Sequence, residues 1–250
     1  MITDPQGTIM ALFLAFCRIG SCLMAMPGFS SARLPVQIRL FLALTLSVAL
    51  LPLLWDVIYP VTQGNTVTFF RAMLYETFIG TMFGLIAHLY LLGMQFAATV
   101  MGTAISFTGP PAQDVLEDTS ESQLAAMLTF GVLLVLFILD FHHVIFKALV
   151  ESYSSIPLGG PISAQRMLIT LTDTLVASMN VAIRVASPFI LFGFLFNVAI
   201  GLINKLAPQI PVYFISTPYA LAGGLLLLYF GIAAVVNQFV DGFFLVFSNM

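Results

Sequence analysis

Charged side chains are scarce in this chain: only 8% of its 250 residues are Asp, Glu, Lys or Arg. A soluble domain carries about 25% charged residues, so this composition excludes an ordinary soluble protein. The net charge is −3, and the few basic residues provide no surface for binding nucleic acid. Because 60% of the residues are hydrophobic, the sequence predicts an integral membrane protein or a subunit enclosed by other apolar chains.

Cysteine and the common catalytic motifs are nearly absent as well. Cys17 and Cys22 are five positions apart, so on one helix they face different directions and predict neither a disulfide nor a metal site. The chain has no P-loop, no HExxH helix, no serine-nucleophile motif and no paired-carboxylate signature. Residues 1–7 contain Asp4 and no Lys or Arg, which does not fit a cleavable signal peptide. We therefore expect no enzyme, no cofactor and no metal.

Six apolar runs are present, and two of them are too long for a bilayer. Residues 72–107 would span about 54 Å as one helix, against about 30 Å of hydrocarbon, and residues 167–206 are longer still. Each run predicts either a buried re-entrant hairpin or a long helix that leaves the membrane plane. Both alternatives require protein neighbours, so we expect an all-α subunit of an assembly. The runs lie near residues 8–27, 38–55, 72–107, 123–149, 167–206 and 212–247.

A polar segment with three prolines interrupts the apolar C-terminal third at residues 204–218. Pro208 and Pro211 remove backbone donors and cannot continue a helix. Lipid offers no partner for the carbonyls that they leave unbonded, so this elbow must lie in protein, in water or at an interface. We interpret its polar and aromatic side chains as contacts with neighbouring subunits. The elbow candidates are Asn204, Lys205, Pro208, Gln209, Tyr213 and Pro218.

Glu76, Gly80, Gly84 and His88 are spaced four apart in the third run and form one stripe on a helix. The Gly80-x-x-x-Gly84 pattern lets a second backbone approach closely. The stripe predicts a packing seam with polar ends; a proton path through Glu76 and His88 is the alternative.

Arg184 lies in the fifth run, on one face with Asn180 and Ser187. A charge inside the membrane requires a partner. Asp173 is too far along the helix to reach Arg184, so we expect the partner on another segment or subunit, and a transport role is the alternative.

The end of the fourth run carries Asp140, His143, Lys147 and Glu151 at helical spacing. This pattern is typical of a solvated, salt-bridged helix end. We do not expect a metal site there, because His142 is predicted to point away from the shared face and Lys147 would repel a cation.

Four sequence blocks, taken together, resemble the FliR/SctT family of type III secretion export-gate subunits. The elbow matches the family pattern N-(K/R)-x-A-P-Q, and HHVIFKALVESYSSIPLG at 142–159 matches a helix that runs into S-x-x-x-I/L-P. FTGPP at 107–111 takes the place of an F-x-D-P turn, with Gly109 where the family has Asp. The first block runs from Arg18 through the Pro27 turn, Pro35 and Arg39 to Pro52.

The resemblance implies a subunit of the flagellar export gate in the bacterial inner membrane, within the flagellar basal body. It implies a FliP-like portion at 1–165 fused to a FliQ-like helical hairpin at 166–250. The implied partners are FliP-like and FliQ-like subunits, FlhB-like and FlhA-like proteins, unfolded export substrates and membrane lipid. The chain would form part of the pore through which unfolded flagellar substrates pass.

The loop near 107–122 matches the family's plug, and a solvated connector is its alternative. The plug candidates are Phe107, Thr108, Gly109, Pro110, Pro111, Asp114, Glu117 and Asp118.

Three other functions remain open at this point. An injectisome subunit of the same family would share these blocks. A small transporter could use Glu76, His88 and Arg184 as coupling groups, although only one clear helix break is present and transporters usually show paired breaks. An intramembrane enzyme around Asp140 and His142 lacks a recognisable motif.

Overall fold

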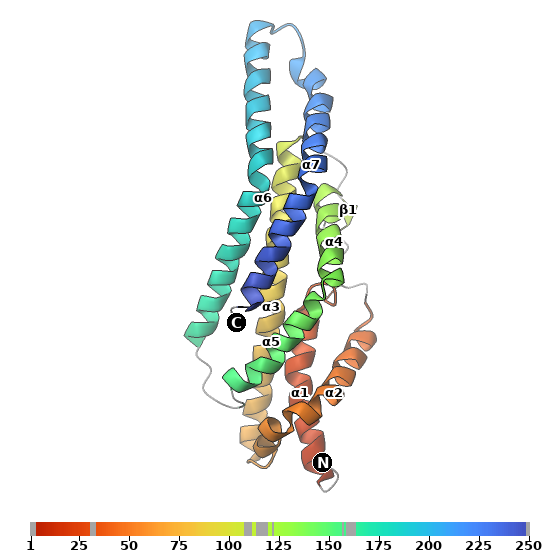
Figure 1. The fold of residues 1–250 in the computed structure, drawn as a ribbon, viewed down its shortest axis with the longest axis vertical. Helices are drawn as coiled ribbons and strands as arrows, with labels where there is room; N and C mark the ends of the chain where they lie inside the picture. The colour runs from red at the N-terminus through yellow and green to blue at the C-terminus, as the bar shows by residue number, and fades with distance from the viewer. Residues whose placement is uncertain are drawn as a thin grey trace. The chain divides into compact units, whose positions relative to one another are not determined.

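The structure is a computed structural model that describes residues 4–30, 34–107, 112–113, 120–121, 123–156, 158 and 164–248. These residues form seven helices and two very short strands (Figure 1), which confirms the predicted all-α class. The helices are α1 Pro5–Ala25, α2 Val36–Thr62, α3 Thr66–Ala104, α4 Gln123–Ile138, α5 Phe141–Ser155, α6 Ala164–Leu206 and α7 Val212–Ser248. The strands β1 (Ala112–Gln113) and β2 (Ser120–Glu121) pair antiparallel, with Ala112 opposite Glu121.

Local sequence explains where α1 begins and ends. Asp4 is the N-cap, and its Oδ1 accepts a hydrogen bond from the Gly7 amide at 3.1 Å. Pro5 occupies the first turn, where a missing amide proton costs nothing. At the other end Met26 takes an extended conformation with ψ 133°. Pro27 follows, and a residue before proline disfavours the helical region.

The two overlong runs are single helices. α3 has 39 residues and α6 has 43, which correspond to about 59 Å and about 65 Å. The re-entrant hairpin alternative is therefore wrong for both runs. α7, with 37 residues, is a third overlong helix that the sequence analysis did not single out.

Four prolines lie inside helices instead of ending them. Pro52 and Pro60 are in α2, Pro188 in α6 and Pro218 in α7. α2 consequently continues to Thr62, beyond the predicted end near residue 55. Helices in apolar surroundings tolerate proline where local adjustment and neighbouring groups satisfy the freed carbonyls.

The fourth apolar run is two helices, because the backbone turns at Asp140. This residue has φ 56° and ψ 33°, the left-handed conformation, in which a helix cannot continue. Asp140 is therefore the N-cap of α5. The helical spacing of Asp140 and His143 suggests instead one continuous helix, and that prediction is wrong.

The chain forms two compact units, each with its own core. Unit 1 contains Met1–Leu89, Asp140–Thr174 and Phe247–Met250, and unit 2 contains Tyr90–Leu139 and Leu175–Val246. In unit 1, α1 packs along α2 and buries side chains such as Leu14 and Ile19. In unit 2, the second part of α3 is buried along most of its length, at Met94, Ala98 and Met101 among others. The predicted division at 165/166 rests on resemblance to other families and stays a prediction.

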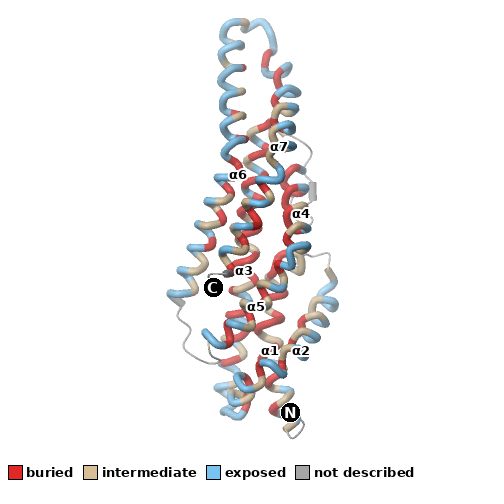
Figure 2. Tube along the Cα trace, viewed as in Figure 1, coloured by how far each residue is buried: buried red, intermediate tan, exposed pale blue. Residues whose placement is uncertain are grey.

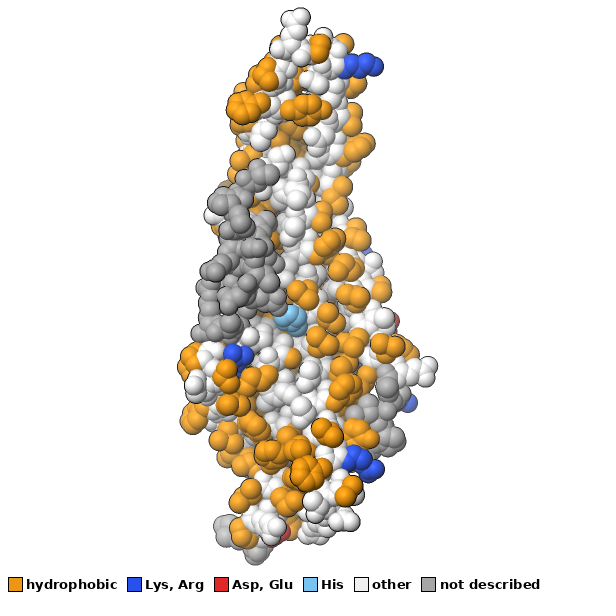
Figure 3. Space-filling view, turned by 180° about the vertical axis from the view of Figure 1, so that it is seen from behind, with side chains coloured by type: hydrophobic (Ala, Val, Ile, Leu, Met, Phe, Trp, Pro, Cys, Tyr) orange, Lys and Arg blue, Asp and Glu red, His pale blue; other side chains and the backbone are white. Residues whose placement is uncertain are grey.

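Five helices are long and apolar enough to cross a membrane, or up to six if α4 and α5 count together as one span. Much of their apolar surface is exposed: only 22% of the most apolar window of α6, and 22% of that of α7, is buried. Figure 2 shows this as long exposed stretches on α6 and α7 beside the turn that joins them. In Figure 3 hydrophobic side chains are spread over the visible face, with few charged ones. The protein is a membrane protein.

Candidate functional site

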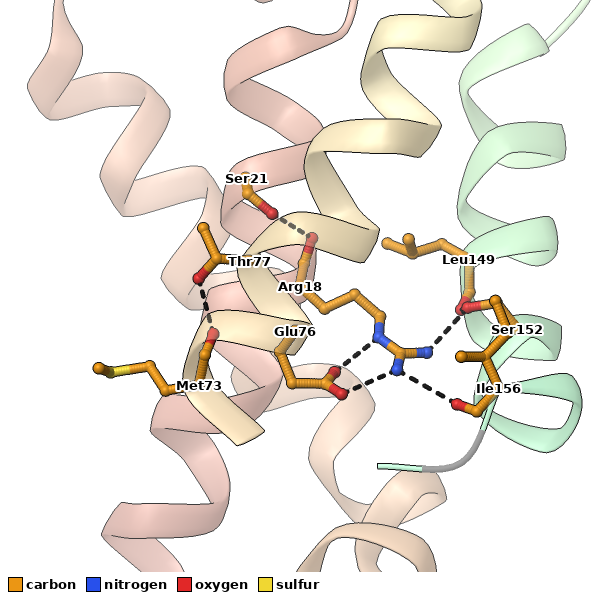
Figure 4. Close-up of polar contacts among 8 residues, drawn as sticks. All are labelled: Arg18, Ser21, Met73, Glu76, Thr77, Leu149, Ser152 and Ile156. Atoms are coloured by element: carbon orange, nitrogen blue, oxygen red, sulfur yellow. Dashed lines mark hydrogen bonds and ion pairs between the residues drawn. The ribbon is translucent and has the colours of Figure 1, made fainter. Parts of the chain in front are cut away.

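A buried ion pair joins α1 to α3 in unit 1 (Figure 4). The Arg18 Nε donates to Glu76 Oε2 at 2.6 Å, and Nη2 donates to Oε1 at 2.9 Å. Both side chains are fully buried, with 0% exposed. The planar guanidinium fork matches a carboxylate in this two-bond geometry, so the pair fixes the registry of one helix against the other.

The same guanidinium also reaches α5. Its Nη1 donates to Ser152 Oγ at 2.9 Å, and Nη2 donates to the Ile156 carbonyl at 3.4 Å. The carbon atom at its centre lies 3.7 Å from the centroid of the Tyr153 ring, a cation–π contact. Arg18 therefore connects three helices, and we call Arg18, Glu76, Ser152 and Tyr153 the arginine cluster.

Sequence reasoning had placed Glu76 on a packing seam and Arg18 in a family block, without pairing the two. A usable signal was present: an Arg within an apolar run requires a partner, and Glu76 is an acid in an apolar run of its own. The two residues are 58 positions apart, so no helical spacing joins them.

Gly80 and Gly84 lie where α3 meets α1. A Cβ on Gly80 would collide with the Arg18 carbonyl oxygen, and one on Gly84 would lie 2.5 Å from the Cys22 carbonyl oxygen. Both clashes are with backbone atoms, so only glycine permits this approach. His88 is half-buried farther along the stripe.

In unit 2, two glycines enclose the last turn of α3, directly before the predicted plug loop. A Cβ on Gly193 of α6 would collide with the Ala104 carbonyl, and one on Gly224 of α7 with the Ile105 side chain. Ser106 then turns left-handed, with φ 58°, and the Phe107 amide donates back to the Gly102 carbonyl at 2.8 Å. We call Gly193 and Gly224 the glycine socket.

Of the eight plug candidates, the structure describes one. Phe107 is half-buried just after α3. β1 and β2, which flank residues 114–119, pair with each other. The remaining candidates lie outside the described residues: Thr108, Gly109, Pro110, Pro111, Asp114, Glu117 and Asp118.

The elbow is shorter than the 204–218 segment. α6 ends at Leu206 and α7 begins at Val212. The turn between them is closed by hydrogen bonds from the Ala207 amide to the Ile203 carbonyl at 2.9 Å and from the Ile210 amide to the Ala207 carbonyl at 3.1 Å. Pro208 and Gln209 lie in the turn and are exposed.

The other elbow candidates lie on the flanking helices. Asn204 is half-buried and Lys205 is exposed in the last turn of α6, and Tyr213 and Pro218 are exposed in α7. Pro208 and Pro211 thus mark the true break, while Pro218 lies inside α7.

Arg184 projects from α6 with its side chain exposed, as do Asn180 and Ser187. Within the described residues its guanidinium has no hydrogen-bond or ion-pair partner, and Ser187 Oγ donates only to the Arg184 backbone carbonyl at 2.8 Å.

Asp140, His142 and His143 come together at the start of α5, with their nearest ligand atoms within 4.8 Å of one another. The expectation that His142 points away was wrong, because Asp140 precedes the helix in a left-handed turn. His142 Nε2 lies 3.9 Å and His143 Nδ1 3.6 Å from Asp140 Oδ1. These donors could hold a metal ion, although Asp140 and His143 are largely exposed. Lys147 lies farther along and pairs with Glu151 at 3.9 Å.

Comparison with known proteins gives matches along almost the whole chain. The sequence model of the family described as "Bacterial export proteins, family 1" matches residues 9–245. A Flagellar biosynthetic protein FliR from Caulobacter vibrioides is 26% identical over 230 residues, which cover 91% of this chain and 90% of the relative. The protein of the same name from Aquifex aeolicus is 26% identical and covers 96% and 93%, and that from Escherichia coli is 23% identical and covers 86% and 82%. This chain belongs to the bacterial export proteins, family 1.

Proposed function

We propose that this chain is a non-enzymatic subunit of the flagellar type III protein export gate, present in one copy and forming part of the pore for unfolded flagellar substrates. The observation that carries the proposal is the family match over residues 9–245, together with nearly full-length similarity to proteins named for flagellar biosynthesis. Those names favour the flagellum over the injectisome alternative. The site of action is the bacterial inner membrane, in the flagellar basal body.

Helix length supports an assembled state. α6 and α7 extend about 65 Å and about 56 Å, roughly twice the hydrocarbon thickness of a bilayer. Exposed apolar residues continue to the turn that joins them, at Leu206, Ile210 and Phe214. Lipid cannot cover such a length of both helices, so neighbouring protein must cover the remainder.

The partners in this proposal are FliP-like and FliQ-like subunits, which form a closed helical assembly with this chain. FlhB-like and FlhA-like proteins are further partners. Residues 1–165 take the FliP-like position and residues 166–250 the FliQ-like hairpin. The elbow residues, exposed at Pro208, Gln209 and Tyr213, would contact the neighbours.

The arginine cluster weakens the transporter alternative. A coupling carboxylate must gain and lose a proton during transport, but Glu76 is held by two hydrogen bonds from Arg18 in a fully buried site. In this proposal the arginine cluster holds α1, α3 and α5 together.

Native mass tests the proposal. The tagged chain is co-expressed with its FliP-like and FliQ-like neighbours and extracted in mild detergent. We expect a discrete heteromeric complex that contains one copy of this chain. A monomer or homodimer that is stable without companions would contradict the proposal, because the long exposed helices would then need no partner.

We further propose that the Thr108–Ser122 loop closes the pore. The loop starts from a fixed base, since the glycine socket encloses the last turn of α3, and β1 pairs with β2 within it. Deleting Gly109–Thr119 should leave assembly intact and raise the small-ion conductance of membranes that contain the complex. Replacing the same residues by an equally long Gly/Ser segment is the matched control for chain length. Unchanged conductance in the deletion variant would contradict the plug.

A further inference from the structure

Arg184 interrupts an apolar stretch of α6. Between Asp173 and Lys205 it is the sole charged residue. At the rise of an α-helix, Arg184 lies about 16 Å from Asp173 and about 31 Å from Lys205 along the axis. Exposed side chains of Ile183, Leu191 and neighbouring residues surround it on the same outward surface.

The opposite face of α6 packs within unit 2. Ala182, Val185, Ala186 and Phe189 are buried there, so Arg184 points away from its own unit. No carboxylate reaches it within the described residues, and Asp173 on the same helix is out of range.

An exposed guanidinium among apolar side chains needs an anion when the helix is in a membrane. We propose that Arg184, with Asn180 and Ser187, forms a docking stripe for a membrane helix of a neighbouring subunit that presents an Asp or Glu carboxylate. Five fixed donors suit a carboxylate in two-bond geometry. The Asn180 amide, one turn away, can bond the partner's backbone or side chain.

Charge placement favours a protein carboxylate over a lipid phosphate. A helix segment at the headgroup level normally carries Trp or Tyr side chains and several Lys or Arg residues, but residues 174–196 contain no Trp, no Tyr and no charge besides Arg184. The inference rests on the proposed function, because it requires a neighbouring subunit.

Charge reversal tests the stripe in the co-expressed complex. Arg184→Glu should reduce the yield of assembled complex at least tenfold, and Arg184→Gln severalfold, because each removes the cation. Arg184→Lys should retain part of the yield. The matched control is Arg71→Glu, which reverses an exposed cation in α3, away from the stripe and the elbow, and should change the yield less than twofold.

Two readouts exclude a folding defect and identify the partner. Because the Arg184 side chain is exposed and has no hydrogen-bond or ion-pair partner within the described residues, Arg184→Glu should leave the detergent unfolding midpoint of the isolated chain unchanged. In the wild-type complex a photoreactive residue at position 187 should crosslink to a neighbouring subunit. A basic substitution of the acidic residue in the crosslinked helix should then restore assembly of Arg184→Glu.

The outcomes separate the two proposals. If the wild-type complex forms and Arg184→Glu assembles equally well, the stripe is wrong and the export-gate function stands. Crosslinking to phospholipid alone would also overturn the stripe, and would assign Arg184 to a lipid headgroup. If the wild-type chain forms no heteromer, both proposals fail.

Discussion

Replacing Glu76 by glutamine is expected to destabilise the chain by about 3–5 kcal/mol, because it leaves the fully buried Arg18 cation without its counter-ion. The neutral amide cannot compensate a charge in a site from which water is excluded. The loss should appear in the unfolding free energy of the detergent-purified chain, measured by titration with a denaturing detergent. Assembled complex in cells should fall accordingly.

A double variant distinguishes the missing charge from poor packing. Arg18→Met combined with Glu76→Leu removes both charges and keeps apolar volume, and such replacements are often neutral or stabilising. Ser152 would keep a partner, because its hydroxyl also donates to the Leu149 carbonyl. We therefore expect the double variant to be much more stable than Glu76→Gln alone.

Asp173→Asn is the control for loss of an acid, since Asp173 is exposed and its neutralisation should change stability by no more than about 0.5 kcal/mol. If Glu76→Gln proves as mild as this control, the ion pair does not hold α1, α3 and α5 together.

The sequence predicts helices in this protein better than it predicts their contacts. Apolar runs with few charges identified the membrane helices, and Pro208 and Pro211 marked the turn between α6 and α7. Pro52, Pro60 and Pro188 did not act as breakers, because a helix in apolar surroundings tolerates proline where local adjustment and neighbouring groups satisfy the freed carbonyls. The left-handed Asp140, which divides the fourth run, left no pattern in the spacing.

Long-range pairs were harder to predict for a physical reason. Arg18 and Glu76 lie on different helices, and periodicity relates only positions on one helix. The Gly80-x-x-x-Gly84 pattern was visible because its members share a face. Gly193 and Gly224 form the glycine socket from two helices, so nothing in their local sequences connects them.

Alanine at the glycine socket is the second large effect that we expect. Gly193→Ala and Gly224→Ala should each destabilise the chain by about 1–3 kcal/mol, since a Cβ would force α6 or α7 away from the last turn of α3. Gly231→Ala is the matched control: it lies in α7 with no atom within 4 Å of an added Cβ, and it should gain up to about 1 kcal/mol from helix propensity. Detergent unfolding of the purified variants measures all three.

The double variant Gly193→Ala/Gly224→Ala tests whether the socket also positions the loop. Both added methyl groups push on the same turn, at Ala104 and Ile105, so the combined loss of stability should be smaller than the sum of the single losses. Because Ser106 and Phe107 follow that turn directly, its displacement should move the base of the Thr108–Ser122 loop and raise small-ion conductance, as the loop deletion does. A double variant that is destabilised but does not leak would separate the two properties: the socket would then serve packing alone, and closure of the pore would depend on contacts made by the loop itself.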